Sequence, residues 1–503
     1  ALHLLLYGDR LPGIRSEAAK PLNLMRHEIK LLGRIFGPEF EAALPRTAEE
    51  MNLAQKAIDV LNVPRSLITA IDVSAAGRQG GVLAARNPKE WAEAWGPMVR
   101  SMASEQGFDA VATELRRSPY WDDALLHDLF ISDIGGAQNV AEEVFISRFA
   151  KNIPGVQASE RGYSMFLNYL RLKTYEKYAA RWERTAQKWG WSQDRLDLAK
   201  RQTANFLNHA TGRGDLSGVQ QFIPALNAFF FSPRYLASRA QSVWDLVKPS
   251  TDPAVRQMIF ENLGAFVGLG TTALAVLAAT GAAVVELDPR SSDFGKIRIG
   301  DQRIEFWAGF QPLARFIAQM ATAERKELFT GKTIPVYPGE TMLRFIRSKL
   351  SPAGALGYDL TVGRGRTFEG DKLFLVDPTK ETAWREFRQR LLPLSIQDAI
   401  EGYQEQGIGA ALTAAGVSAF GGGVGTFSAS EEQQKKVASS IIETKLAEAG
   451  IPDRNKTFAE DEGFRTAFAQ AFGVPPDRVP TDFSEFRDGM IKRAVAGGLS
   501  ETE

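Results

Sequence analysis

The chain has 503 residues, of which 44% are hydrophobic and 10% aromatic; this is the composition of a folded globular protein and excludes a disordered one. Lysine plus arginine and aspartate plus glutamate both total 60, so the net charge is zero. This balance argues against tight nonspecific binding to nucleic acid, because phosphate neutralisation dominates such binding. Cysteine is absent, which excludes disulfides, cysteine-ligated metals and cysteine nucleophiles in this chain.

Helical patterning dominates the first 250 residues. Apolar residues recur at threes and fours over 21–36, which predicts an amphipathic helix. Asn87-Pro-Lys-Glu predicts a helix start, with Asn87 as N-cap and Pro88 in the first turn. The strongest helix prediction is 158–188, where aromatic residues alternate with lysine and arginine. We interpret this pattern as an aromatic core face opposite a solvated charged face, in preference to a stacking surface for single-stranded nucleic acid.

The clearest strand signal lies at 296–307, where apolar and polar residues alternate about a Gly-Asp turn. This pattern predicts a β-hairpin with a type II′ turn. The predicted register pairs Ile297 with Ile304 and places Arg298 opposite Arg303. Two facing arginines are unfavourable unless one of them binds a carboxylate or another anion.

We predict a mainly α, multi-lobed fold with one small β-hairpin at about 296–307. Two segments rich in Gly, Pro and Asp, 331–340 and 352–380, are predicted as long surface loops. The expected regions are 1–135 with N-terminal helices, 136–250 with the long helix, 251–400 with an apolar helix, the hairpin and the loops, and 401–503 with a Gly/Ala-rich run and C-terminal helices.

Two runs without charged residues, Asn262–Val285 and Gln406–Ser430, carry the main functional prediction. Each is long enough to cross a bilayer as a helix. Each also contains a G-x-x-x-G step, which allows close helix packing in lipid and equally suits a tight helix pair in a soluble protein. The predicted close-packing positions are Gly264, Gly268, Gly421 and Gly425.

We expect these two runs to be buried against each other in the folded protein and to reach a membrane only after a rearrangement. The side chains expected to fill the seam between them are Leu274, Val276, Leu277, Phe420 and Phe427.

No catalytic, cofactor-binding or metal-binding residue is predicted. The four histidines lack the i, i+4 spacing of a helical zinc site, and no P-loop sequence occurs. Asp293-Phe-Gly matches the magnesium-binding tripeptide of protein kinases, but the glycine-rich loop and the His-Arg-Asp catalytic loop are missing. We therefore expect a non-enzymatic protein, with an enzyme of unrecognised site kept as one alternative.

Six segments spread over about 61–323 together resemble a domain found in very large phage polyvalent proteins and in internal virion (ejection) proteins of short-tailed phages. They are Asp72–Gly81, Ala158–Tyr163, Asn208–Gly214, Asn227–Tyr235, Asp288–Arg298 and Trp307–Gln311. The resemblance identifies no active-site residue.

The resemblance implies a protein that is packaged inside the virion and delivered with the genome to the host cell envelope. The implied partners are further copies of the chain, other ejection or portal proteins, phage DNA bound without sequence preference, and the host membrane. The alternative is a soluble scaffold module of a giant polyvalent protein, which binds partners and never enters a membrane.

Overall fold

The protein is mainly α-helical, with a few short antiparallel strands. The computed structural model describes residues 75–132, 155–216, 229–299, 302–326, 333–365, 372–392 and 423–426, with the single positions 218, 226, 397, 400 and 403. The helix expected at 21–36 and most of the region expected at 401–503 lie outside these residues.

Short helices form the first described part of the chain. They are the π-helix η1 (Ala75–Gln79), α6 (Gly81–Ala84), α7 (Pro88–Glu93), α8 (Trp95–Ala103), α9 (Glu105–Arg116) and α10 (Trp121–Leu126). The helix start predicted at Asn87 is confirmed, with Pro88 as the first helical residue. The Asn87 side chain, however, makes no capping hydrogen bond and instead joins a buried network described below.

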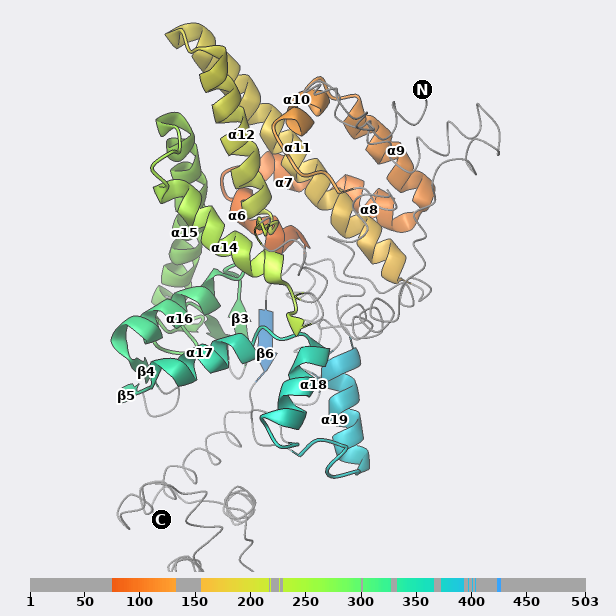
Figure 1. Ribbon diagram of the computed structural model, residues 1–503, viewed down its shortest axis with the longest axis vertical. Coiled ribbons are helices and arrows are strands. Elements are labelled where there is room, and N and C mark those ends of the chain that lie inside the picture. Colours follow the sequence, from red (N-terminus) through yellow and green to blue (C-terminus); the bar gives the residue numbers. More distant parts are fainter. Residues whose placement is uncertain are drawn as a thin grey trace, which may run out of the picture.

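Four longer helices build the body of the bundle. They are α11 (Val156–Trp189), α12 (Gln193–Ala210), α14 (Pro233–Val247) and α15 (Pro253–Ala279). In Figure 1, α11 and α12 run side by side, with α8 and α9 against the other flank of α11 and α14 and α15 beyond α12. The long helix predicted at 158–188 is confirmed as α11.

One hydrophobic core fills this bundle and extends from Val82 to Ala308. The aromatic face predicted for α11 supplies Phe166, Tyr175 and Trp182, which are buried. The described parts of the regions expected at 1–135 and 136–250 therefore share one core.

Arg239 on α14 is a buried cation that ties several segments together. It is 1% exposed, and its guanidinium lies between the rings of Tyr235 and Phe310. The guanidinium donates to the backbone carbonyls of Ala308 at 2.6 Å, Arg78 at 2.7 Å and Ala210 at 2.9 Å. Three elements distant in sequence thus meet at one side chain.

A four-stranded antiparallel sheet lies at the end of the bundle, in the order β1-β2-β3-β6. Its strands are β1 (Val284–Val285), β2 (Ile297–Ile299), β3 (Gln302–Glu305) and β6 (Gly423–Thr426). The predicted register is confirmed, because Ile297 pairs with Ile304 and Arg298 with Arg303. The expected hairpin is thus the centre of a larger sheet.

The buried carboxylate of Asp293 offsets the repulsion between the two facing arginines by binding one of them. Arg303 is buried, and its Nε donates to Asp293 Oδ2 at 2.6 Å. Lys296 lies 3.6 Å from the other carboxylate oxygen, while Arg298 is exposed. The tripeptide beginning at Asp293 therefore has a structural role at the sheet.

Helices and a second small sheet surround the first sheet. They are α16 (Phe310–Thr322), β4 (Glu324–Lys326), β5 (Thr333–Pro335), α17 (Pro338–Arg347), α18 (Pro352–Thr361) and α19 (Lys380–Leu391). The loops predicted at 331–340 and 352–380 are wrong over part of their length, because α17 begins at Pro338 and α18 covers Pro352–Thr361. Each of these helices places a proline in its first turn, where the missing N–H costs nothing.

Candidate functional site

The apolar helix α15 is the feature that the sequence singles out and that the structure places at the surface. Asp252 caps it by accepting a hydrogen bond from Ala254 N at 2.8 Å, and Pro253 is its first residue. Its 27 residues span about 40 Å at 1.5 Å each. Among the described residues, α15 alone is long and apolar enough to cross a membrane, with a mean hydropathy of 1.6.

One stripe along α15 is buried. Its members recur every three or four residues and face the bundle: Val255, Met258, Ile259, Asn262, Phe266, Gly270 and Leu274. They pack against α6, α12, α14 and β1. Only 17% of the most apolar 18-residue window of α15 is buried inside the protein.

Polar contacts hold the first half of α15 in place. Asn262 Nδ2 donates to the Tyr178 hydroxyl at 2.9 Å, and Asn262 Oδ1 accepts from Asn87 Nδ2 at 2.9 Å. Beside them, Glu261 accepts from Arg181 at 3.2 Å and from Arg86 at 3.4 Å. Burial acts to raise the pKa of Glu261, but these two guanidinium groups outweigh it and lower that pKa below its usual value.

The second half of α15 is docked on the sheet through Gly270. A Cβ at this position would lie 2.7 Å from the ring of Trp307, so only glycine allows this approach. Trp307 is fixed in turn, because its indole N–H donates to Gly295 O at 2.7 Å and its ring meets Phe266 edge to face. Sequence analysis did not identify Gly270, because it lies two residues beyond the more conspicuous Gly264-to-Gly268 step.

The outer surface of α15 remains apolar and exposed. Phe260, Val267, Leu269 and Val276 are half or more exposed, with Leu269 at 62%. The expectation that this run is buried is therefore wrong. Its residues are apolar on every side, but the described chain covers only one side.

The two predicted packing glycines of this run, Gly264 and Gly268, lie on the exposed side. A Cβ on either would meet nothing within 4 Å. They do not pack against another helix of the described chain. Their role as close-packing positions in a membrane stays a prediction.

The second run is described only at Gly423–Thr426, and there it is a strand. Gly425 lies in β6 and pairs with Arg303 of β3, so the helix expected at this position is wrong. Gly421, Phe420 and Phe427 lie outside the described residues. Of the side chains expected to fill the seam between the two runs, Val276 is exposed and Leu274 is buried.

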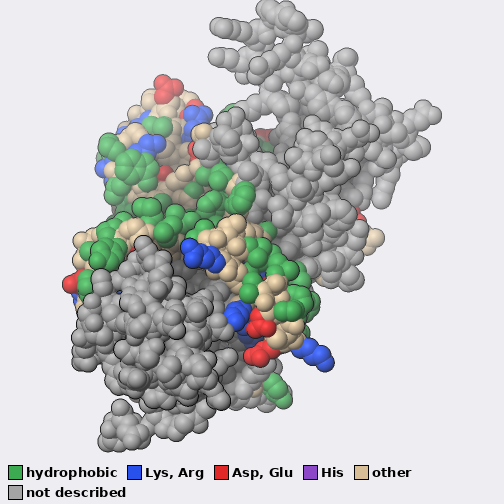
Figure 2. Space-filling view, turned by 60° about the horizontal axis from the view of Figure 1, so that its bottom comes forward, with side chains coloured by type: hydrophobic (Ala, Val, Ile, Leu, Met, Phe, Trp, Pro, Cys, Tyr) green, Lys and Arg blue, Asp and Glu red, His purple; other side chains and the backbone are tan. Residues whose placement is uncertain are grey.

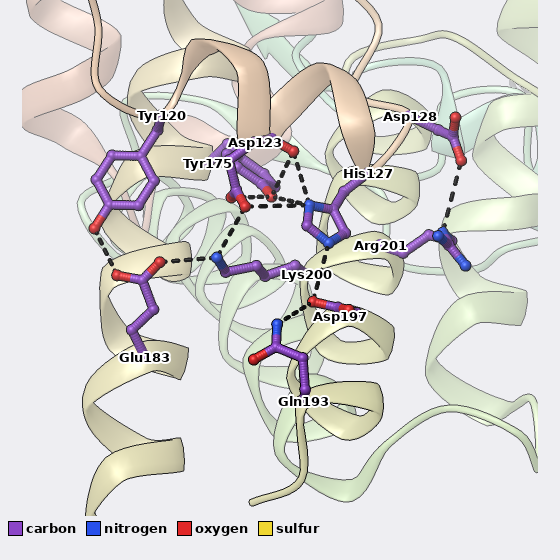
Figure 3. Close-up of polar contacts among 10 residues, drawn as sticks. All are labelled: Tyr120, Asp123, His127, Asp128, Tyr175, Glu183, Gln193, Asp197, Lys200 and Arg201. Atoms are coloured by element: carbon purple, nitrogen blue, oxygen red, sulfur yellow. Dashed lines mark hydrogen bonds and ion pairs between the residues drawn. The ribbon is translucent and has the colours of Figure 1, made fainter. Parts of the chain in front are cut away.

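A polar cluster inside the bundle, drawn in Figure 3, was also missed by sequence analysis. Lys200 on α12 is almost fully buried, and its Nζ donates to Asp123 Oδ1 at 3.0 Å and to Glu183 Oε1 at 2.8 Å. The Tyr120 hydroxyl donates to the other oxygen of Glu183 at 2.9 Å. Burial acts to lower the pKa of Lys200, but the two carboxylates raise it overall.

The same cluster continues from Asp123 to a buried histidine. The Tyr175 hydroxyl donates to Asp123 Oδ2 at 2.8 Å, and burial together with this carboxylate raises the pKa of Tyr175. His127 Nδ1 lies 2.7 Å from the backbone oxygen of Asp123. The titratable side chains thus satisfy one another, which suits a junction between α10, α11 and α12. No group of three or more metal-ligating side chains occurs within the described ranges.

Apolar side chains are also exposed away from α15. Figure 2 shows wide areas of hydrophobic side chain on the face that carries the lower part of Figure 1, with few charged groups between them. On α17 the exposed residues include Met342, Leu343 and Ile346, and on α19 they include Trp384 and Phe387.

Comparison with known proteins finds no protein-family model, no curated protein and no solved structure that matches this chain.

Proposed function

We propose that the protein is an internal virion protein of a phage, which oligomerises and assists genome delivery by associating with the membrane of the host envelope through α15. The exposed apolar surface of α15 carries this proposal, and the resemblance to ejection proteins supplies its context. In the virion interior, its implied partners are other copies, ejection or portal proteins and the packaged DNA.

The energetics of the exposed surface support membrane association. Full burial of a large apolar side chain is worth roughly 1.5–3 kcal/mol. Phe260, Val267, Leu269 and Val276 are each half or more exposed, but the first two lie on one flank of the buried stripe and the last two on the other, so a bilayer that contacts one flank gains about 2 kcal/mol. A gain of this size favours reversible binding to a bilayer without any change of fold.

Flotation of the purified chain with liposomes tests the membrane contact. We expect the protein to float with zwitterionic vesicles at neutral pH, and salt to have little effect, because the contact is apolar. Protein that stays at the bottom of the gradient with zwitterionic and anionic vesicles alike contradicts the proposal. Detection of the chain in purified phage particles by mass spectrometry tests its location in the virion.

A soluble scaffold is the second candidate, and the exposed apolar residues of α17 and α19 favour it. Exposed apolar patches of this kind commonly mark protein–protein contacts. This function predicts a fixed oligomer or partner complex in the absence of lipid, which light scattering on the purified chain measures. An enzyme with an unrecognised site stays a hypothesis without a supporting observation.

A further inference from the structure

A cavity of about 330 Å³ lies between α16, α17 and β4. Five of its lining residues are basic and one is acidic. The basic residues are Arg290, Arg315, Arg325, Lys326 and Arg344. Its volume is at the lower end of the range for small-molecule sites.

Arg315 is the cation of this cavity that lacks an ion-pair partner among the described residues. Its Nε is buried and has no hydrogen-bond partner. Burial lowers the pKa of Arg315, and Glu305 and Asp293 offset this only in part. Because a buried charge without close partners is costly, the site gains free energy when an anion enters it.

Other cations of the wall are held in place by ion pairs with carboxylates, most of which do not line the cavity. Arg290 contacts Asp288 at 2.8 Å, and Lys326 Nζ donates to Glu286 at 2.7 Å. The wall is also braced by Gln319, whose side-chain N–H donates to Arg290 O at 2.8 Å. The cationic groups are therefore positioned before any ligand arrives.

Positive charge also surrounds Arg315 outside the cavity lining. The neighbouring side chains of Lys296 and Lys349 are half-buried, and burial lowers the pKa of both, with the charge of Arg315 acting in the same direction. An anion beside Arg315 stabilises all three charges at once.

Apolar and hydroxyl groups complete the cavity. Phe316 and Phe345 stack on each other with ring centroids 4.3 Å apart, which joins α16 to α17 at the wall. Ser292 and Thr341 add hydroxyl groups. A ligand with one anionic end and a small organic body fits this combination.

We propose that this cavity binds the phosphate group of a small phosphorylated molecule, with Arg315 as its main contact. Arginine favours phosphate over a simple point anion, because its planar fork donates two parallel hydrogen bonds. The phosphate can come from a soluble phosphate ester or from a phospholipid headgroup.

Isothermal titration calorimetry of the full chain with ribose 5-phosphate, and with ribose as the control without phosphate, tests the proposal. We expect binding of ribose 5-phosphate and none of ribose. Tighter binding of short-chain phosphatidic acid than of ribose 5-phosphate identifies a lipid source, and the reverse order identifies a soluble ligand. No binding of either phosphorylated probe up to about 10 mM overturns the proposal.

Two variants separate this site from general attraction of anions. Arg315→Met removes the charge and keeps the length of the side chain, so we expect affinity for ribose 5-phosphate to fall about tenfold or more. Its melting temperature without ligand stays the same or rises, because a buried charge is removed. Arg298→Met, at an exposed arginine of β2, serves as the matched control and leaves affinity unchanged.

Arg344→Gln provides a second variant at the cavity wall that does not depend on how the protein tolerates a change at Arg315. We expect weaker binding of ribose 5-phosphate with an unchanged melting temperature. Affinity equal to that of the unmodified chain in both Arg315→Met and Arg344→Gln overturns the assignment of the site.

Discussion

Replacing Leu269 by aspartate tests how α15 meets a membrane. Leu269 is 62% exposed near the middle of the apolar helix, so the change leaves the folded protein in water almost undisturbed. If α15 crosses the bilayer, the variant loses about 1–2 kcal/mol of apolar transfer and a further cost of about 3 kcal/mol for the charge. A total near 4 kcal/mol lowers the partition into vesicles roughly 1,000-fold.

If α15 instead lies along the surface of the bilayer, the aspartate stays near water. The loss is then mainly the apolar contact of one leucine, about 1–2 kcal/mol, or roughly tenfold in partition. Flotation over a range of lipid concentrations measures either value. The size of the effect thus distinguishes a spanning helix from a helix that stays docked on the protein.

Leu126→Asp is the matched control for this measurement. Leu126 is 56% exposed at the end of α10, so it carries the same chemical change at nearly the same exposure on another element. We expect it to float like the unmodified chain. Equal flotation of the unmodified chain, Leu126→Asp and Leu269→Asp refutes the role of α15.

Further predictions concern the contacts that hold α15 and the sheet. Gly270→Ala destabilises the protein by about 1–3 kcal/mol through the clash with the indole ring, whereas Gly268→Ala, in open space on the same helix, stabilises it by up to about 1 kcal/mol; chemical denaturation measures both. Arg239→Met, which leaves buried carbonyls without a donor, costs about 3–5 kcal/mol by the same method. Asp288 has a pKa lowered to about 2, chiefly by its hydrogen bond from Arg290, so its contribution to stability is present above pH 4 and is lost as the pH falls towards 2. Melting temperatures of Asp288→Asn therefore fall less steeply over this range than those of the unmodified chain.

The sequence predicts those elements whose pattern is local. Alternation over 296–307 is enough to pair Ile297 with Ile304 and Arg298 with Arg303, because a two-residue turn fixes the register of a hairpin. The strands at its two edges were missed for the opposite reason. Val284–Val285 has only two residues and shows no alternation, and Gly423–Thr426 becomes a strand only by pairing with residues more than 100 positions away in the sequence.

The helices α17 and α18 were missed although their start signals are present. Pro338 and Pro352 occupy first-turn positions, and Ser351 caps α18 by accepting a hydrogen bond from Gly354 N at 3.0 Å. We interpreted the proline and glycine content of these segments as loop composition. The position of a proline within a segment, and not the number of prolines, indicates whether a helix begins there, because proline is tolerated in the first turn of a helix.

The uniform hydropathy of α15 after Asn262 explains why its helix was predicted correctly and its burial was not. A helix with a polar side identifies which side faces the core, but a helix that is apolar all around leaves the choice to the rest of the chain. In this protein, two residues decide which side of α15 faces the bundle. Asn262 needs polar partners inside the bundle, and Gly270 is the position where the absence of a side chain allows Trp307 to pack against the helix. Neither constraint can be read from hydrophobicity.

These two anchors also bear on how α15 would reach a membrane. Release of the whole helix requires breaking the hydrogen bonds of Asn262 and separating Phe266 from Trp307, which together hold both halves of α15. Contact through Leu269 and its exposed neighbours requires neither, because this side is already exposed. Surface attachment of the intact fold therefore precedes insertion on energetic grounds, and variants at Gly270, which weaken the second anchor alone, shift the balance towards insertion.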